Sequence, residues 1–107
     1  MRETNLLNLS NRRNATRYAV NCEFDFEGRR SMAIDVSRTG MRAVLQGPVT
    51  KGEEIEFDLT FSTGELRVRG QVAWTQGLGG ERQVVGVRFR DEQPDLEIMG
   101  WWVANAA

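Results

Sequence analysis

The chain has 107 residues, 40% of them hydrophobic and 27% charged, values typical of one soluble globular domain. It contains no histidine and a single cysteine, Cys22, which excludes a Ser-His or Cys-His catalytic pair and an internal disulfide, and argues against a thiolate metal site. A net charge of −1 excludes a global positive field that would attract nucleic acid or a membrane surface. Because the chain has no histidine and only one cysteine, we expect neither an enzyme nor a metal or cofactor protein.

Residues 1–11 form a polar N-terminal stretch in which Leu6, Leu7 and Leu9 are the main apolar side chains. This stretch lacks the apolar core of a signal peptide, and no twenty-residue apolar span follows it. We therefore expect a cytoplasmic protein without membrane insertion. It would consist of a flexible arm over residues 1–11 and a single domain over residues 12–107.

After the arm, apolar and polar residues alternate in six short runs, which predicts six strands with one buried face each. Turn residues separate the runs, and Gly70 is expected to mark a bulge or bend within the fifth. The side chains predicted to face inward are Tyr18, Val20, Cys22, Phe24 and Phe26; Met32, Ile34 and Val36; Met41, Ala43 and Leu45; Ile55, Phe57, Leu59 and Phe61; Leu66, Val68, Val72 and Trp74; and Val85, Val87 and Phe89.

The C-terminal segment changes to helical spacing. Pro94 suits a first helical position, and Leu96, Met99 and Val103 recur at intervals of three to four residues. Trp101 and Trp102 are adjacent in that segment, so at most one of them can face the barrel. Six short strands joined by turns favour an antiparallel sheet that closes on itself, which removes exposed edges. The predicted fold is a six-stranded antiparallel β-barrel with a short C-terminal α-helix across its opening.

Two short motifs carry the functional information. The first is R-x-x-x-R at residues 13–17, directly before the first strand and preceded by Arg12. The second is D-x-S-x-x-G at residues 35–40, between the second and third strands. Thirteen of the fourteen basic residues are arginine, whose planar fork suits phosphate oxygens and the O6/N7 edge of guanine. Composition alone favours a genome or lineage preference for arginine over a binding role.

In this order, on an all-β chain of this length, the two motifs resemble the PilZ domain family over roughly residues 12–103. The segments 68–74 and 85–89 also resemble the second half of that family. The resemblance implies a bacterial receptor for the second messenger cyclic di-GMP, held on the barrel surface between the N-terminal arginines and the turn. The implied ligand-binding residues are Arg12, Arg13, Arg17, Asp35, Ser37 and Gly40.

Physical chemistry is compatible with these roles. Arg13 and Arg17 can pair with phosphate or with the guanine edge, and an ionised Asp35 can accept guanine N1–H and N2–H. Ser37 can add a hydroxyl bond, and Gly40 lets the backbone turn or approach the ligand. In the family, an arginine at the position of Arg12 accompanies binding of a stacked pair of ligand molecules, which favours two ligands per chain.

Plain structural interpretations of the same residues remain open. An arginine cluster can be a solvated face, and Asp and Ser in such a turn can cap their own backbone. Met41 and Arg42 are interpreted as strand residues rather than contacts, and Trp74 as core.

The function expected is a cyclic di-GMP receptor or adaptor whose arm becomes ordered on binding and which then signals to an unidentified downstream protein. The alternative is a PilZ-fold protein-interaction module that binds no nucleotide. A small-barrel binder of nucleic acid polymers comes last, because the strand aromatics fall on the apolar face. We expect a monomer or weak homodimer.

Overall fold

The computed structural model describes residues 16–61 and 64–105. Residues 1–15, which comprise the predicted arm together with Arg12 and Arg13 and are called the arm from here on, lie outside the described residues. The described part confirms six strands and a C-terminal helix. Their bounds are β1 Tyr18–Phe26, β2 Arg29–Val36, β3 Gly40–Gln46, β4 Glu54–Phe61, β5 Gly64–Gly79, β6 Arg82–Phe89 and α2 Pro94–Ala104.

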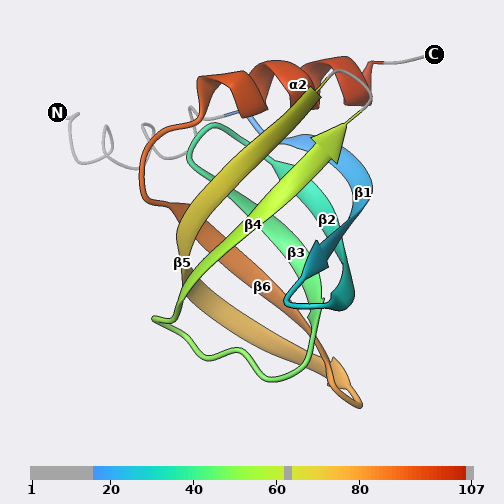
Figure 1. The fold of residues 1–107 in the computed structure, drawn as a ribbon, viewed down its shortest axis with the longest axis vertical. Coiled ribbons are helices and arrows are strands. Elements are labelled where there is room, and N and C mark those ends of the chain that lie inside the picture. The colour runs from blue at the N-terminus through green and yellow to red at the C-terminus, as the bar shows by residue number, and fades with distance from the viewer. Residues whose placement is uncertain (1–15, 62–63, 106–107) are drawn as a thin grey trace, which may run out of the picture.

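The six strands form one antiparallel sheet that curls into a nearly closed barrel (Figure 1). Their order is β1-β2-β3-β6-β5-β4, so β1 and β4 are the two edges that come together at a seam. Side chains join this seam: the rings of Phe24 and Phe57 stack with centroids 4.7 Å apart, and Cys22 Sγ lies 3.8 Å from the carbonyl oxygen of Thr60. The predicted closure of the sheet is therefore achieved by aromatic packing at the β1–β4 seam.

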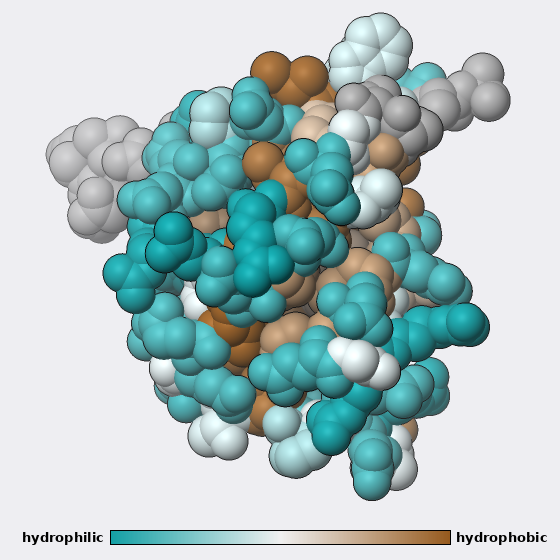
Figure 2. All heavy atoms as spheres, in the orientation of Figure 1, coloured by the Kyte–Doolittle hydropathy of each residue, from teal (hydrophilic) through white to brown (hydrophobic). Residues whose placement is uncertain are grey.

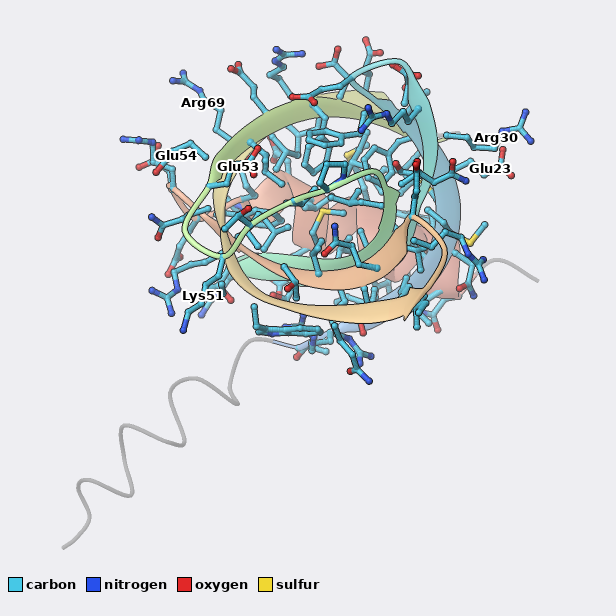
Figure 3. All side chains as sticks on the ribbon, turned by 90° about the horizontal axis from the view of Figure 1, so that it is seen from below. Glu23, Arg30, Lys51, Glu53, Glu54 and Arg69 are labelled. Atoms are coloured by element: carbon cyan, nitrogen blue, oxygen red, sulfur yellow. The ribbon has the colours of Figure 1, made fainter. Side chains whose placement is uncertain are left out.

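Alternating burial along the strands confirms most of the predicted core. The cleanest case is β4, where every apolar residue is buried and every polar neighbour is exposed. The inward positions predicted for β3 and β6 are buried as well. Charged side chains such as Glu54 and Arg69 project outward from the ring of strands (Figure 3). Period-two patterning thus separates a dry interior from a charged exterior.

Strand β2 corrects the prediction for its inward face. Met32, expected in the core, is 36% exposed, whereas its neighbour Ala33 is completely buried. The pairing of β2 with β3 shifts register between Ala33 and Asp35, which marks a β-bulge. Because a bulge inserts one extra residue, the alternation changes phase there, and Asp35 and Val36 are both buried.

Strand β5 differs in a similar way. It runs through to Gly79, across part of the expected 77–80 loop, and its first register shift lies between Val72 and Trp74 rather than at Gly70. Gly70 serves a different purpose, since a Cβ there would lie 2.6 Å from the carbonyl oxygen of Arg88 on β6. After the shift, Trp74 points outward and is 40% exposed, so its prediction as a core residue was wrong.

Helix α2 lies across one end of the barrel, as predicted (Figure 1). Leu96 is fully buried beneath it, and Met99 and Val103 pack against the core. Gly100 allows close contact, because a Cβ there would lie 2.7 Å from Val36 Cγ2. Within the described part of the chain, no helix has the length and apolar character needed to cross a bilayer.

Candidate functional site

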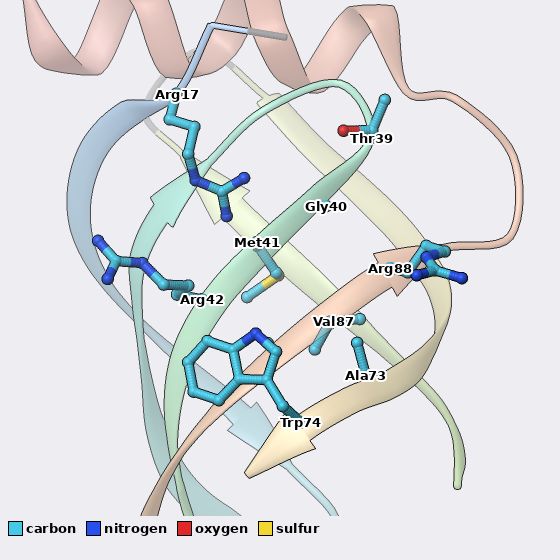
Figure 4. Close-up of a pocket in the computed structure, with 10 residues that line it drawn as sticks. Arg17, Thr39, Gly40, Met41, Arg42, Ala73, Trp74, Val87 and Arg88 are labelled. Atoms are coloured by element: carbon cyan, nitrogen blue, oxygen red, sulfur yellow. The ribbon is translucent and has the colours of Figure 1, made fainter. Parts of the chain in front are cut away.

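A surface hollow of about 780 Å³ lies on the outer face of the barrel, where β3, β6 and β5 run side by side (Figure 4). It extends from Arg17, just below α2, toward Trp74 on β5. Its lining residues are Arg17, Thr39, Gly40, Met41, Arg42, Ala73, Trp74, Gly86, Val87 and Arg88.

At the Arg17 end of this hollow, one carboxylate holds two guanidinium groups. Asp35 Oδ1 accepts from Arg17 Nε at 3.3 Å and lies 3.2 Å from Arg17 Nη2. Asp35 Oδ2 accepts from Arg42 Nε at 2.8 Å and from Arg42 Nη2 at 2.5 Å. The side chain of Asp35 is only 9% exposed, while those of Arg17 and Arg42 are 44% and 48% exposed. A desolvated anion therefore positions two cations that still face solvent.

The β2 bulge explains why Asp35 lies there. After the register shift, Asp35 pairs directly with Arg42 on β3, and their side chains meet across the strands. The hydrogen bond with Asp35, reinforced by the attraction of opposite charges, raises the pKa of Arg42 further above its ordinary value. Arg42 therefore remains a cation at any pH at which the protein functions.

Ser37 is fully buried and organises the turn that follows β2. Its Oγ accepts the backbone N–H groups of Thr39 and Gly40, both at 3.2 Å, and its own N–H donates to the carbonyl oxygen of Gly40 at 2.8 Å. This is the self-capping arrangement that the sequence left open. Ser37 thus shapes the turn beside the hollow, and a direct bond to a ligand stays a prediction.

Gly40 lies where the chain enters β3 and lines the hollow. A Cβ at this position would overlap the carbonyl oxygen of Val87 on β6, and the backbone of Gly40 is not in the left-handed region. The glycine is therefore required for the close approach of β3 to β6 rather than for an unusual turn conformation.

Among the charged and aromatic lining residues, three escaped the sequence analysis as site residues: Arg42, Trp74 and Arg88. Arg42 was interpreted as an ordinary strand residue, and its partnership with Asp35 depends on the bulge. The indole of Trp74 packs against Gly86, where an added Cβ would overlap Trp74 Nε1. The R-x-R pattern at Arg88 and Arg90 carries no signal that separates a site residue from a solvated one.

Of the six predicted site residues, the structure brings together Arg17 and Asp35, with Ser37 and Gly40 in the adjoining turn. Arg12 and Arg13 lie outside the described residues. The hollow is electropositive: three guanidinium groups line it, and the one neighbouring carboxylate, Asp35, pairs with two of them, which leaves an excess of two positive charges. In the described part of the chain, no three potential metal ligands gather into a group. The arrangement suits an anion that also offers a flat surface for stacking.

Comparison with known families independently identifies the family to which the chain belongs. The family model of the PilZ domain matches residues 10–101, which is most of the 107-residue chain. The search of curated proteins found no match. PilZ domains are non-catalytic modules that generally bind cyclic di-GMP. The match, together with the barrel and its C-terminal helix, shows that the chain belongs to the PilZ domain family.

Proposed function

We propose that the hollow binds cyclic di-GMP and that the protein is a receptor which passes its ligand-bound state to a downstream protein. The observation that carries this proposal is the direct contact between Arg17, which precedes β1, and Asp35, at the end of β2. The contact brings the last residue of the first motif and the first residue of the second motif to one end of an electropositive hollow.

The ligand offers chemistry that matches the Asp35 cluster. Cyclic di-GMP carries two phosphodiester charges and two guanines, and each guanine has N1–H and N2–H donors and O6 and N7 acceptors. Arg17 holds Asp35 at longer distances than Arg42 does, so it is the partner that releases more readily. We infer an exchange in which a guanine edge replaces Arg17 on Asp35, and the freed guanidinium binds phosphate or O6/N7.

The rest of the hollow provides a stacking surface and further charge. The exposed indole of Trp74 presents a ring face on which a guanine can stack, and Arg88 adds a third cation on the β6 side. A volume of about 780 Å³ falls within the range of roughly 300–1,000 Å³ that is usual for small-molecule sites. The hollow is therefore large enough for a dinucleotide.

Arg12 and Arg13 complete the proposed site from the arm. Arg13 precedes the first described residue, Thr16, by three positions, and three residues can span about 10 Å. Arg13 can therefore reach the ligand beside Arg17. We keep Arg12 as the residue that favours a second, stacked ligand molecule.

Calorimetric titration with cyclic di-GMP tests the proposal. We expect Arg13→Ala and Arg17→Ala each to cost about 2–3 kcal/mol of binding free energy, or roughly 30- to 150-fold in affinity. Arg67→Ala is the matched control, because Arg67 also lies on the barrel surface and pairs with two carboxylates, but at the β1–β4 seam. Equal affinity of wild type and both site variants would refute the assignment.

The same titration reports stoichiometry. Two ligands per wild-type chain and one per Arg12→Ala chain would support the role we give to Arg12. A complete absence of binding would instead favour a PilZ module that recognises protein alone.

A further inference from the structure

The outward face of α2 carries an exposed apolar stripe made of Ile98, Trp101 and Trp102. These side chains are 56%, 45% and 56% exposed, and their spacing places them side by side on one helix face. The two indoles meet edge to face with centroids 5.2 Å apart. Since Leu96 and Gly100 of the same helix are buried, α2 is apolar on both sides. Figure 2 shows hydrophobic atoms at the top, over α2, and further hydrophobic atoms between the hydrophilic side chains of the strands below.

The start of the barrel lies directly beside this helix. Tyr18, the first residue of β1, packs against Gly100, where an added Cβ would lie 3.3 Å from Tyr18 Cβ. Gly100 immediately precedes Trp101. The arm that leads into β1 therefore joins the described chain next to the apolar stripe.

The arm has the length and composition to cover the stripe. Leu6, Leu7 and Leu9 lie seven to ten residues before Thr16, and a stretch of that length spans at most about 23–33 Å. Helix α2, with eleven residues, is only about 16 Å long. The leucines can therefore reach every position on the outward face of the helix.

Charge also favours this docking. Helix α2 contains Asp95 and Glu97 and no basic residue, whereas the part of the arm nearest the barrel contains Arg12 and Arg13. An arm that places its leucines on the indoles brings these opposite charges toward one another.

We propose that Leu6, Leu7 and Leu9 cover Ile98, Trp101 and Trp102 while the hollow is empty, and that ligand binding withdraws them. The second half rests on the proposed function. The hollow extends from Arg17 away from α2, so a ligand that captures Arg13 pulls the arm away from the helix (Figure 4). The released tryptophan face is then the surface that a downstream protein recognises, because large aromatic side chains dominate binding energy at interfaces.

Acrylamide quenching of tryptophan fluorescence tests the shielding in the full chain without any ligand. The Trp74→Phe background leaves Trp101 and Trp102 as the only emitters. In that background, the triple change Leu6→Ser, Leu7→Ser and Leu9→Ser should raise the quenching constant by about twofold, since aliphatic cover hides a large part of each indole. Leu78→Ser, which alters an exposed leucine on β5, is the matched control and should change nothing.

An unchanged quenching constant in the triple variant, with the thermal melt intact, would overturn the shielding. So would sedimentation data showing a dimer whose dissociation on dilution alone uncovers the indoles, because a second copy would then be the occupant.

The ligand half of the proposal has its own readout. Saturating cyclic di-GMP should raise quenching in the Trp74→Phe chain to the level of the triple variant and should add nothing in the triple variant itself. Calorimetric binding without any change in quenching would overturn the coupling. Absence of binding to the wild-type chain would refute the proposed function instead, and the ligand-free comparison would still decide whether the arm shields the helix.

Discussion

Two depressions on this small barrel both contain an arginine that pairs with carboxylates, but they carry opposite net charge. The hollow beside Asp35 has an excess of positive charge. The groove of about 380 Å³ along the β1–β4 seam is strongly acidic, with Arg67 as its basic lining residue. Acidic residues that line the seam groove are Glu23, Asp25, Glu27, Glu56, Asp58 and Glu65. Because their charges largely cancel in the net charge of −1, composition alone reveals neither region.

Burial distinguishes the ion pairs of the two regions. Arg67 bonds Glu56 at 2.9 Å and Asp58 at 3.2 Å, and hydrogen bonds with Glu56 and then Asp58 raise its pKa. All three side chains are about half exposed, whereas the Asp35 side chain is only 9% exposed. Exposed pairs stabilise a protein little, but charges along two sheet edges discourage pairing with another chain. The feature that distinguishes the candidate site from the seam groove is therefore the buried carboxylate of Asp35, and not the presence of ion pairs.

Gly40→Ala should show the largest effect, because the hollow depends on a backbone contact that cannot move aside. A Cβ at Gly40 would overlap the carbonyl oxygen of Val87, so we expect a loss of about 2–3 kcal/mol in the free energy of unfolding, measured by urea denaturation. Gly77→Ala is the control, since nothing lies within 4 Å of the Cβ position there. If both variants unfolded at the same urea concentration, the close approach of β3 to β6 would not require glycine at position 40.

Asp35→Ala compared with Asp58→Ala tests the difference in burial directly. We expect Asp35→Ala to lower the free energy of unfolding by about 1–2 kcal/mol, less than for a fully buried pair because Arg17 and Arg42 can hydrate once released. Asp58→Ala should change it by less than about 0.5 kcal/mol. Equal changes in urea denaturation would remove the distinction between the two regions.

Trp74→Ala should reduce affinity for cyclic di-GMP by about 1–2 kcal/mol, or roughly 5- to 30-fold, because a stacking surface is lost. Stability should change little, since the indole is 40% exposed. Leu78→Ala, another exposed apolar residue on β5, should leave the calorimetric affinity unchanged. A variant at Trp74 that binds like wild type would exclude stacking from the site.

The smallest expected effect lies at the seam, where burial raises the pKa of the Cys22 thiol. The reactive thiolate is therefore scarcer in the folded protein than in the unfolded chain, and its fraction grows only as pH rises beyond the ordinary thiol range. We expect alkylation at pH 8 to be slower in native protein than in urea, and to accelerate with pH. Equal rates in the two states would show that the seam does not shelter Cys22.

Much of the fold follows from local patterns. Period-two alternation predicted all six strands, and Pro94 with the spacing of Leu96, Met99 and Val103 predicted α2. The motif resemblance implied that Arg17 and Asp35 belong to one ligand site, and in the structure their side chains are in direct contact. Arg42 and Trp74 were missed because each was judged by its own strand alone.

The sequence by itself determined the number of strands, the C-terminal helix, the family, and Arg17 and Asp35 as candidate site residues, because these depend on short-range periodicity and motif order. The tertiary structure alone decided the faces of Met32, Ala33 and Trp74, and hence which other side chains border the hollow. Those faces depend on bulges in β2 and β5, and a bulge is set by pairing with strands distant in the chain. A shift of the strand register by one residue reverses which side chains point outward, and this shift cannot be predicted from the local alternation of apolar and polar residues.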